Sequence, residues 1–192
     1  RLAALDVAPV INLLSDRAHP TQAIADVLTI AEVGTLGSGS TGSGGAGSGG
    51  TGSGGAGSGG AGSGGTADFD LGGAVVAYVG DANNVTRSLA IAAGRMGAEV
   101  RVAVPDGYGF DADELAELAA AGGEISVQGA DPAEVVGGAD VIYTDVWTSM
   151  GQEDEAAQRL KDFAGFTVDE PLMSSAADDA IFLHCLPAHR DE

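Results

Sequence analysis

Five short apolar segments recur along the chain after residue 70, and helical patterns separate each from the next. They lie at residues 74–79, 99–104, 124–128, 140–144 and 180–183. Each is apolar enough to be covered on both faces, which is typical of strands in a parallel sheet. Strands that alternate with helices favour an α/β fold with a doubly wound parallel sheet, in which ligands bind at the carboxyl ends of the strands.

The stretches between these strands carry clear signals for where helices begin. Asp111 is followed three residues later by Glu114, the spacing of a capping box. Asp131 precedes Pro132, a residue favoured in the first turn of a helix, and Gly137 predicts where that helix ends. These signals support the alternation of strands and helices.

The first part of the chain has a different organisation. Residues 9–14 (PVINLL) predict a short buried strand, and Pro20 then opens a helix. The apolar positions with helical spacing are Ile24, Val27, Leu28 and Ala31. Residues 37–66 contain only Gly, Ser, Thr and Ala and repeat TGSGGAGSGG, which predicts a flexible, disordered linker without chemistry. We therefore divide the chain into a strand–helix piece (1–36), the linker (37–66) and one α/β domain (67–192).

The charge of the chain excludes several classes of partner. The sequence contains eight Lys and Arg residues and 28 Asp and Glu residues, which gives a net charge of −20. Such a field repels nucleic-acid phosphates and anionic lipid headgroups, so we expect neither nucleic acid nor a membrane as partner. Lysine occurs once, at Lys161, and an acidic surface of this kind suggests the hypothesis of a salt-adapted protein.

Location and redox chemistry follow from what the sequence contains. No apolar run approaches the roughly 18 residues that span a bilayer, and the first residues lack the pattern of a signal peptide, so we expect a cytoplasmic protein. The single cysteine, Cys185, excludes an internal disulfide and a thiolate zinc cluster. Because the chain starts at Arg1 and ends just after a chemically dense stretch, we expect a fragment.

Three polar clusters follow predicted strands, and they should meet at one edge of the sheet. They are GDANNV at residues 80–85, DVWTSMG at 145–151 and HCLP at 184–187. The first cluster lacks the second and third glycines that bring backbone close to a pyrophosphate, so a dinucleotide site is disfavoured. Asn83 and Asn84 can cap the following helix or contact a carboxylate at its start; capping is favoured for Asn83, and both roles stay open for Asn84.

The other two clusters contain residues with both a structural and a chemical interpretation. Asp145 can cap the next turn or bind an ammonium group beside a cleft. Cys185 can be an inert buried thiol or part of a site. Because His184 is its neighbour on a strand, alternation should point the two side chains apart, which disfavours a nucleophilic Cys–His dyad. His19 can cap the first helix or act in a site, and Ser149 and Met150 alone carry little evidence.

The combination of motifs carries more information than any one of them. HPTQ at residues 19–22 is followed by GDANNV, DVWTSMG and HCLPAHR in that order. This arrangement closely resembles the ornithine carbamoyltransferases of the aspartate/ornithine carbamoyltransferase family, over residues 9–33 and 71–192. The resemblance implies the ornithine-binding domain of a transcarbamylase, truncated at its C-terminus, joined to a strand and helix of the carbamoyl-phosphate domain.

The resemblance also implies an activity, a substrate pair and an assembly. The enzyme would transfer the carbamoyl group of carbamoyl phosphate to the δ-amino group of L-ornithine, giving L-citrulline and phosphate, in arginine biosynthesis or in the arginine deiminase pathway. The reaction needs no metal and no redox cofactor. Family members are trimers or built from trimers, with active sites at subunit borders, so a homo-oligomer is expected for the complete protein.

Roles for individual residues come from the same resemblance. His19 and Gln22 would hydrogen-bond the carbonyl and amide of carbamoyl phosphate. The positions that would hold the α-carboxylate and α-amino groups of ornithine, or lie beside its reacting amine, are Asn84, Asp145, Ser149, Met150, Cys185 and Leu186. We hypothesise that Asp145 positions the α-amino group and that Cys185 contacts the δ-amine, with no covalent intermediate.

The chain also departs from the family pattern. The family's Ser-Thr-Arg-Thr-Arg phosphate loop has no counterpart here, and neither has a later arginine, so we expect the fragment to be inactive alone. Two alternatives stay open: a noncatalytic amino-acid-binding or interaction module that keeps the fold, and a transcarbamylase for another amine such as acetylornithine or putrescine.

Overall fold

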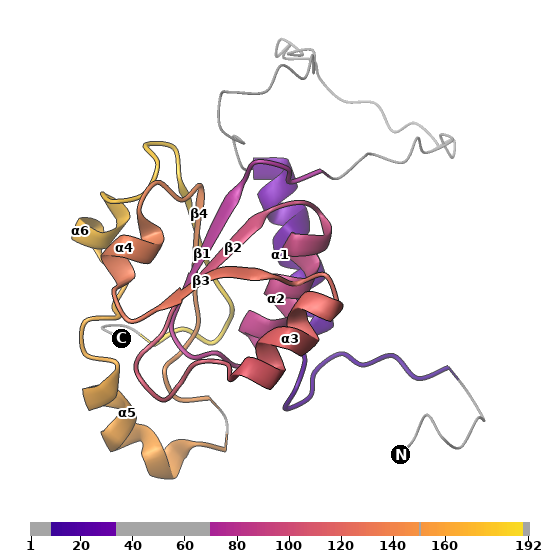
Figure 1. The fold of residues 1–192 in the computed structure, drawn as a ribbon. Helices are drawn as coiled ribbons and strands as arrows, with labels where there is room; N and C mark the ends of the chain where they lie inside the picture. The colour runs from indigo at the N-terminus through magenta and orange to yellow at the C-terminus, as the bar shows by residue number, and fades with distance from the viewer. Residues whose placement is uncertain (1–8, 34–69, 150, 190–192) are drawn as a thin grey trace, which may run out of the picture.

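A computed structural model describes residues 9–33, 70–149 and 151–189, and Figure 1 gives its ribbon. The predicted linker at residues 37–66 lies outside these residues. Five parallel strands form one sheet in the order β3-β2-β1-β4-β5. The strands are β1 (Val75–Val79), β2 (Glu99–Ala103), β3 (Ile125–Gly129), β4 (Val141–Thr144) and β5 (Ile181–His184). All five predicted strands and the parallel α/β fold are confirmed.

Helix α1 precedes the first strand, and the other helices lie where the chain crosses between strands. They are α1 (Pro20–Val33), α2 (Asn84–Arg95), α3 (Ala112–Ala120), α4 (Pro132–Val136), the 3₁₀ helix η2 (Glu153–Glu155), α5 (Ala156–Asp162) and α6 (Glu170–Met173). The predicted capping box at α3 is present, since Asp111 and Glu114 bond reciprocally. Asp131 caps α4, whose first residue is Pro132 and whose C-cap is Gly137. Each helix in the part of the chain that the structure describes is too short or too polar to span a bilayer.

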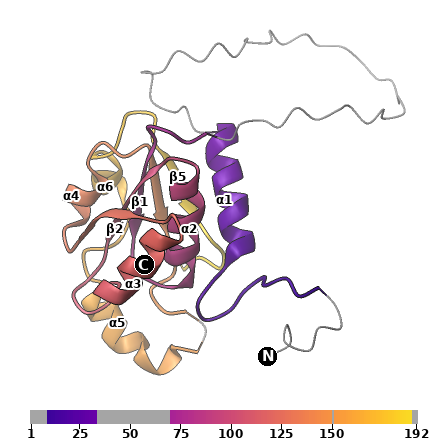
Figure 2. The same cartoon turned by 45° about the vertical axis from the view of Figure 1, so that its right-hand side comes forward.

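The sheet is the middle layer of three. Figures 1 and 2 show α1, α2 and α3 on one face and α4, α5 and α6 on the other. Because successive strand side chains point to opposite faces, one core contains Tyr78 and Tyr143 beneath α1 and α2. The second core contains Ile142, Trp147 and Phe163 on the face that α4, α5 and α6 cover (Figure 1). The central strands β1 and β4 are therefore buried on both sides, as their apolar sequences predict. The same expectation is wrong for the edge strands β3 and β5, in which Val127 and Phe182 are exposed.

The strand order reverses between β1 and β4. From β1 the chain steps outward to β2 and β3, then returns to place β4 on the other side of β1 and β5 beyond it. In doubly wound sheets this reversal leaves a crevice at the carboxyl ends of the two strands, because the connections diverge there to opposite faces. Two of the three polar clusters follow these two strands.

One predicted strand is wrong. Residues 9–14 have no strand structure and are exposed, with Ile11 at 78% and Leu13 at 61%. A strand needs a neighbouring backbone to pair with, and among the described residues this segment has none. The nearest pairing is a single antiparallel bridge between Ser15 and Ala18.

Helix α1 is confirmed, but its buried face differs from the predicted one. The buried residues are Ala23, Asp26, Val27 and Ile30, whereas Ile24 and Leu28 are 63% and 41% exposed. Figure 2 shows α1 standing beside α2. Of the predicted apolar positions, Val27 alone is buried, because the helix packs through a face that includes a carboxylate.

Candidate active site at the carboxyl edge of the sheet

The end of β1 places two asparagines at the start of α2. Asn83 is the N-cap: its side-chain oxygen accepts from the backbone N–H of Val85 (2.9 Å) and of Thr86 (3.1 Å). The predicted capping role of Asn83 is thus confirmed. Its amide nitrogen also donates to Asp145 Oδ2 at 3.0 Å. Asn84 donates from its amide to the carbonyl of Ser15 at 2.7 Å, so it ties α2 to the segment that precedes α1.

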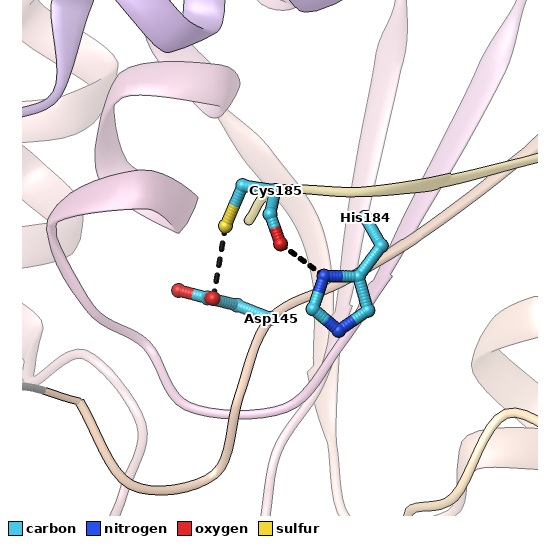
Figure 3. Close-up of side chains that lie close together, drawn as sticks. All are labelled: Asp145, His184 and Cys185. Atoms are coloured by element: carbon cyan, nitrogen blue, oxygen red, sulfur yellow. Dashed lines mark hydrogen bonds between the residues drawn. The ribbon is translucent and has the colours of Figure 1, made fainter. Parts of the chain in front are cut away.

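The ends of β4 and β5 meet at a thiol–carboxylate pair. The Cys185 thiol donates to Asp145 Oδ1 at 2.9 Å, and the same oxygen accepts from the Val146 N–H at 2.8 Å. Figure 3 shows the thiol pointing toward the carboxylate. Together with the bond from Asn83, these contacts join the ends of β1, β4 and β5. The three polar clusters therefore meet at one edge of the sheet, as expected.

Burial and charge determine the state of the thiol. Cys185 is buried, and desolvation raises the pKa of its thiol strongly. The hydrogen bond to Asp145 and the negative charge of that carboxylate raise the same pKa further. The protonated thiol is a hydrogen-bond donor and a poor nucleophile, because thiolate is the reactive form.

His184 takes no part in the thiol–carboxylate hydrogen bond. Its Nδ1 lies against the carbonyl oxygen of Cys185, and Figure 3 shows the imidazole on the side away from the thiol. The described contacts of the thiol and the imidazole are therefore with different groups, the Asp145 carboxylate and the Cys185 carbonyl. Even so, Asp145, His184 and Cys185 offer potential metal-ligand atoms within 4.8 Å of one another. All three could hold a metal together only after the thiol loses its proton.

The HPTQ motif lies at the start of α1, on the face of the sheet that α1, α2 and α3 cover, next to the carboxyl edge of the sheet. Pro20 occupies the first helical position, where its missing N–H leaves no helical bond unmade. The His19 N–H donates to Ser88 Oγ in α2 at 2.8 Å. Within the described part of the chain, the buried Nδ1 of His19 has no hydrogen-bond partner. Buried polar atoms without a partner are rare in native proteins, so this nitrogen marks His19 as a candidate site residue.

The structure says less about the roles of the remaining predicted site residues, Ser149, Met150 and Leu186. The Ser149 N–H donates to Gln152 Oε1 at 3.1 Å, which shapes the loop after β4. Met150 lies outside the described residues. Leu186 follows Cys185 and is 84% exposed. Their predicted contacts with ornithine stay predictions.

A buried arginine supports two of the three clusters and was not predicted. Arg159 in α5 is 3% exposed; its guanidinium pairs with Asp81 and also donates to the Trp147 carbonyl. It lies over the rings of Tyr108 and Phe163, at 4.8 and 5.2 Å from their centroids. Arg159 thereby connects the loop after β1 to the loop after β4. A single arginine within a short polar helix gave no sequence signal of burial.

A second unpredicted group links α1 to the sheet. Asp26 accepts hydrogen bonds from Gln22 Nε2 and from the Tyr143 hydroxyl, both at 2.9 Å. Burial raises the pKa of Asp26, while the two hydrogen bonds and the nearby His19 lower it. A signal existed in the sequence, because Asp26 stands next to Val27 and four residues before Ile30 on the apolar side of the helix.

Known proteins match both the α/β domain and the chain as a whole. Residues 72–192 match the family model described as the Asp/Orn binding domain of aspartate/ornithine carbamoyltransferase. The chain belongs to the aspartate/ornithine carbamoyltransferase family. The ornithine carbamoyltransferase of Acidothermus cellulolyticus is 45% identical over the whole chain, which covers 51% of that protein. That of Sulfurovum sp. is 42% identical over 98% of the chain and 51% of its own length.

Solved structures of family members share the fold. The ornithine carbamoyltransferase from Pyrococcus furiosus matches all of the chain with a TM-score of 0.73 and 40% identity. The enzyme from Thermus thermophilus matches it with a TM-score of 0.69 and 37% identity. The chain covers 51% and 50% of these structures, so it spans about half the length of the family members it matches.

Proposed function

We propose that this chain is the ornithine-binding half of an ornithine carbamoyltransferase, which forms L-citrulline and phosphate from carbamoyl phosphate and L-ornithine. The observation that carries the proposal is the junction of Asn83, Asp145 and Cys185, where the ends of three strands meet through hydrogen bonds. Relatives at 45% and 42% identity bear the name of this enzyme, which supports the same conclusion.

We assign the site residues to two groups: those that would contact carbamoyl phosphate and those that would contact ornithine. His19 and Gln22 would hydrogen-bond the carbonyl and amide of the carbamoyl group and polarise the carbon under attack. The unpartnered Nδ1 of His19 supports this role. Asp145 would hold the α-amino group of ornithine, with Asn84, Ser149 and Met150 beside it. Cys185 and the backbone of Leu186 would lie next to the reacting amine.

The reaction requires orientation and proton removal. An alkyl amine has a pKa of about 10.4, so the δ-amino group must lose a proton before it attacks. The attack forms a tetrahedral oxyanion, which collapses with loss of phosphate, and fixed hydrogen-bond donors stabilise that charge. A thiol that is held protonated by Asp145 supports a contact role for Cys185 and argues against a covalent intermediate.

The chain needs further residues to bind the phosphate. Within the described residues, every arginine is already engaged with protein groups: Arg17, Arg87, Arg95, Arg101 and Arg159. A dianionic phosphate next to a chain of charge −20 requires cations from elsewhere. We therefore propose that residues 1–36 belong with the carbamoyl-phosphate domain and residues 67–192 form the ornithine domain. The active form would be a trimer-based assembly of the complete protein in the cytoplasm, serving arginine metabolism.

Calorimetry and a product assay test the proposal. We expect the chain to bind L-ornithine and to form citrulline from carbamoyl phosphate only when the missing half of the family sequence is supplied. Asp145→Asn should weaken ornithine binding by about tenfold or more, because a charged hydrogen bond is lost. Asp106→Asn, which removes the same charge from an exposed loop, is the matched control and should bind normally.

Two results would count against the proposal. Binding of ornithine without citrulline formation in the completed protein would favour a noncatalytic amino-acid-binding module. Carbamoylation of acetylornithine or putrescine in preference to ornithine would favour a different amine substrate.

A further inference from the structure

A carboxylate lies on the buried face of α1, where an apolar residue would be expected. Asp26 is 7% exposed and its neighbours on that face are Ala23, Val27 and Ile30. Burying a carboxylate is unfavourable unless hydrogen bonds replace its lost hydration. The sequence around it offers apolar packing, so the reason for a carboxylate here must lie in the groups that it contacts.

Both groups that contact Asp26 donate hydrogen bonds to it. The Gln22 amide nitrogen donates to Oδ1 and the Tyr143 hydroxyl donates to Oδ2, each at 2.9 Å. Tyr143 is fully buried in β4, two residues before Asp145. The Asp26 carboxylate therefore connects the HPTQ motif of α1 to β4, the strand that ends next to Asp145.

The bond to Gln22 determines which end of that amide is free. An ionised carboxylate only accepts hydrogen bonds, so it selects the NH₂ end of the glutamine amide. The amide is planar, with oxygen and nitrogen on opposite sides of its carbon, so the oxygen must point away from Asp26. Gln22 thus presents a hydrogen-bond acceptor, in a fixed orientation, one helical turn from His19.

A hydrogen-bond acceptor at the Gln22 oxygen would distinguish carbamoyl phosphate from acetyl phosphate. A carbamoyl group carries an NH₂ that can donate to the Gln22 oxygen. An acetyl group of nearly the same shape carries a methyl, which would leave that oxygen without a partner. Sites built to hydrogen-bond a donor reject analogues that lack it, because the buried polar group is left unpaired.

We propose that Asp26 is a positioning residue that fixes the amide of Gln22 with its oxygen toward the acyl phosphate and so selects a carbamoyl over an acetyl group. The part concerning selectivity rests on the proposed function, whereas the part concerning the orientation of Gln22 does not. Tyr143 donates to the other carboxylate oxygen, Oδ2, and so does not itself contact Gln22 through that bond.

The orientation is tested in the 192-residue chain by NMR of its glutamine side chains. We expect the Gln22 NH₂ protons to exchange with solvent more slowly than those of Gln158. Gln158 makes the same (i, i+4) bond to Asp162 on an exposed surface and is the internal control. Asp26→Asn should change the Gln22 NH₂ resonances and speed their exchange. Tyr143→Phe keeps the carboxylate and should leave the Gln22–Asp26 bond in place.

Selectivity is tested in the protein completed with the other half of the family sequence. The measured quantity is the ratio of the dissociation constants of acetyl phosphate and carbamoyl phosphate. We expect Asp26→Asn to lower this ratio about tenfold, the worth of one hydrogen bond, and Tyr143→Phe to leave it within about twofold. A purely structural role for Asp26 would weaken both ligands equally and leave the ratio unchanged.

The outcomes separate the inference from the proposed function. A Gln22 NH₂ that exchanges as fast as that of Gln158, in the wild-type chain, overturns the inference even where Asp26→Asn does not fold. An unchanged selectivity ratio in Asp26→Asn also overturns it. If the NMR results are as expected but the completed protein forms no citrulline, the orientation of Gln22 stands and the proposed function fails.

Discussion

At the scale of single residues, burial decides chemistry that the residue type leaves open. Cys185 lies in the core on the α1–α2 face of the sheet, yet its thiol contacts a carboxylate at the rim. The pKa of that thiol is raised by burial first and by Asp145 second. The sequence offered an inert thiol and a site residue as alternatives, and the structure gives a protonated, hydrogen-bonded thiol that is compatible with a contact role.

The state of Cys185 predicts slow alkylation. At pH 8 we expect iodoacetamide to react with the folded chain at least about 100-fold more slowly than with the chain in guanidinium, since only thiolate reacts. Asp145→Asn removes a charge that raises the thiol pKa, so it should react faster than wild type but still slower than the unfolded chain. Asp106→Asn should behave as wild type. Equal rates in the folded and unfolded wild-type chain would contradict the assignment of a protonated, buried thiol.

At the scale of elements, the local signals for the α/β domain were sufficient. The caps Asp111 and Asp131 and the apolar segments predicted α3, α4 and the five strands, because these signals depend on neighbours within a few residues. Helix α6 was not predicted. The prediction of a strand at residues 9–14 was wrong for the opposite reason, because a strand forms only beside another backbone segment with which it can hydrogen-bond. The contact between α2 and the turn before β3 also depends on residues far apart in sequence.

That contact predicts the effect of a single methyl group. Gly123 is buried, and a Cβ there would lie 2.8 Å from the backbone N and Cα of Ile91 in α2. We expect Gly123→Ala to lower the free energy of unfolding by about 1–3 kcal/mol, because the backbone must move. Gly129→Ala is the control: its Cβ would meet only Val135 Cγ2, at 3.9 Å. Urea denaturation measures both, and equal stability of the two variants would show that α2 and the turn pack loosely.

At the scale of the whole molecule, net charge and fold are separate properties. A charge of −20 on 192 residues repels itself and disfavours the compact state, although no single residue is responsible. The ion pairs that the structure describes between exposed groups, such as Arg17 with Glu117 at 2.8 Å, contribute little individually. Stability should therefore depend on screening by salt.

This dependence is measured by thermal unfolding at increasing salt. We expect the melting temperature to rise by several degrees between about 0.05 M and 1 M KCl, because the Debye length falls from more than 10 Å to about 3 Å. Sucrose of equal osmolality is the control, since it stabilises by exclusion without screening charge. A melting temperature that responds equally to sucrose and KCl would remove the case for a salt-adapted protein.

The sequence by itself determined the five strands and the capped helices of the α/β domain, the sheet edge at which the polar clusters meet, and the family. These depend on local patterning and on the fixed geometry of parallel sheets. The tertiary structure alone decided that Asp26 faces Tyr143, that Arg159 pairs with Asp81, and that α1 buries Ala23 and Ile30 rather than Ile24 and Leu28. Those contacts join residues up to 117 positions apart, and their formation depends on how helices seat on the sheet, which no local pattern encodes.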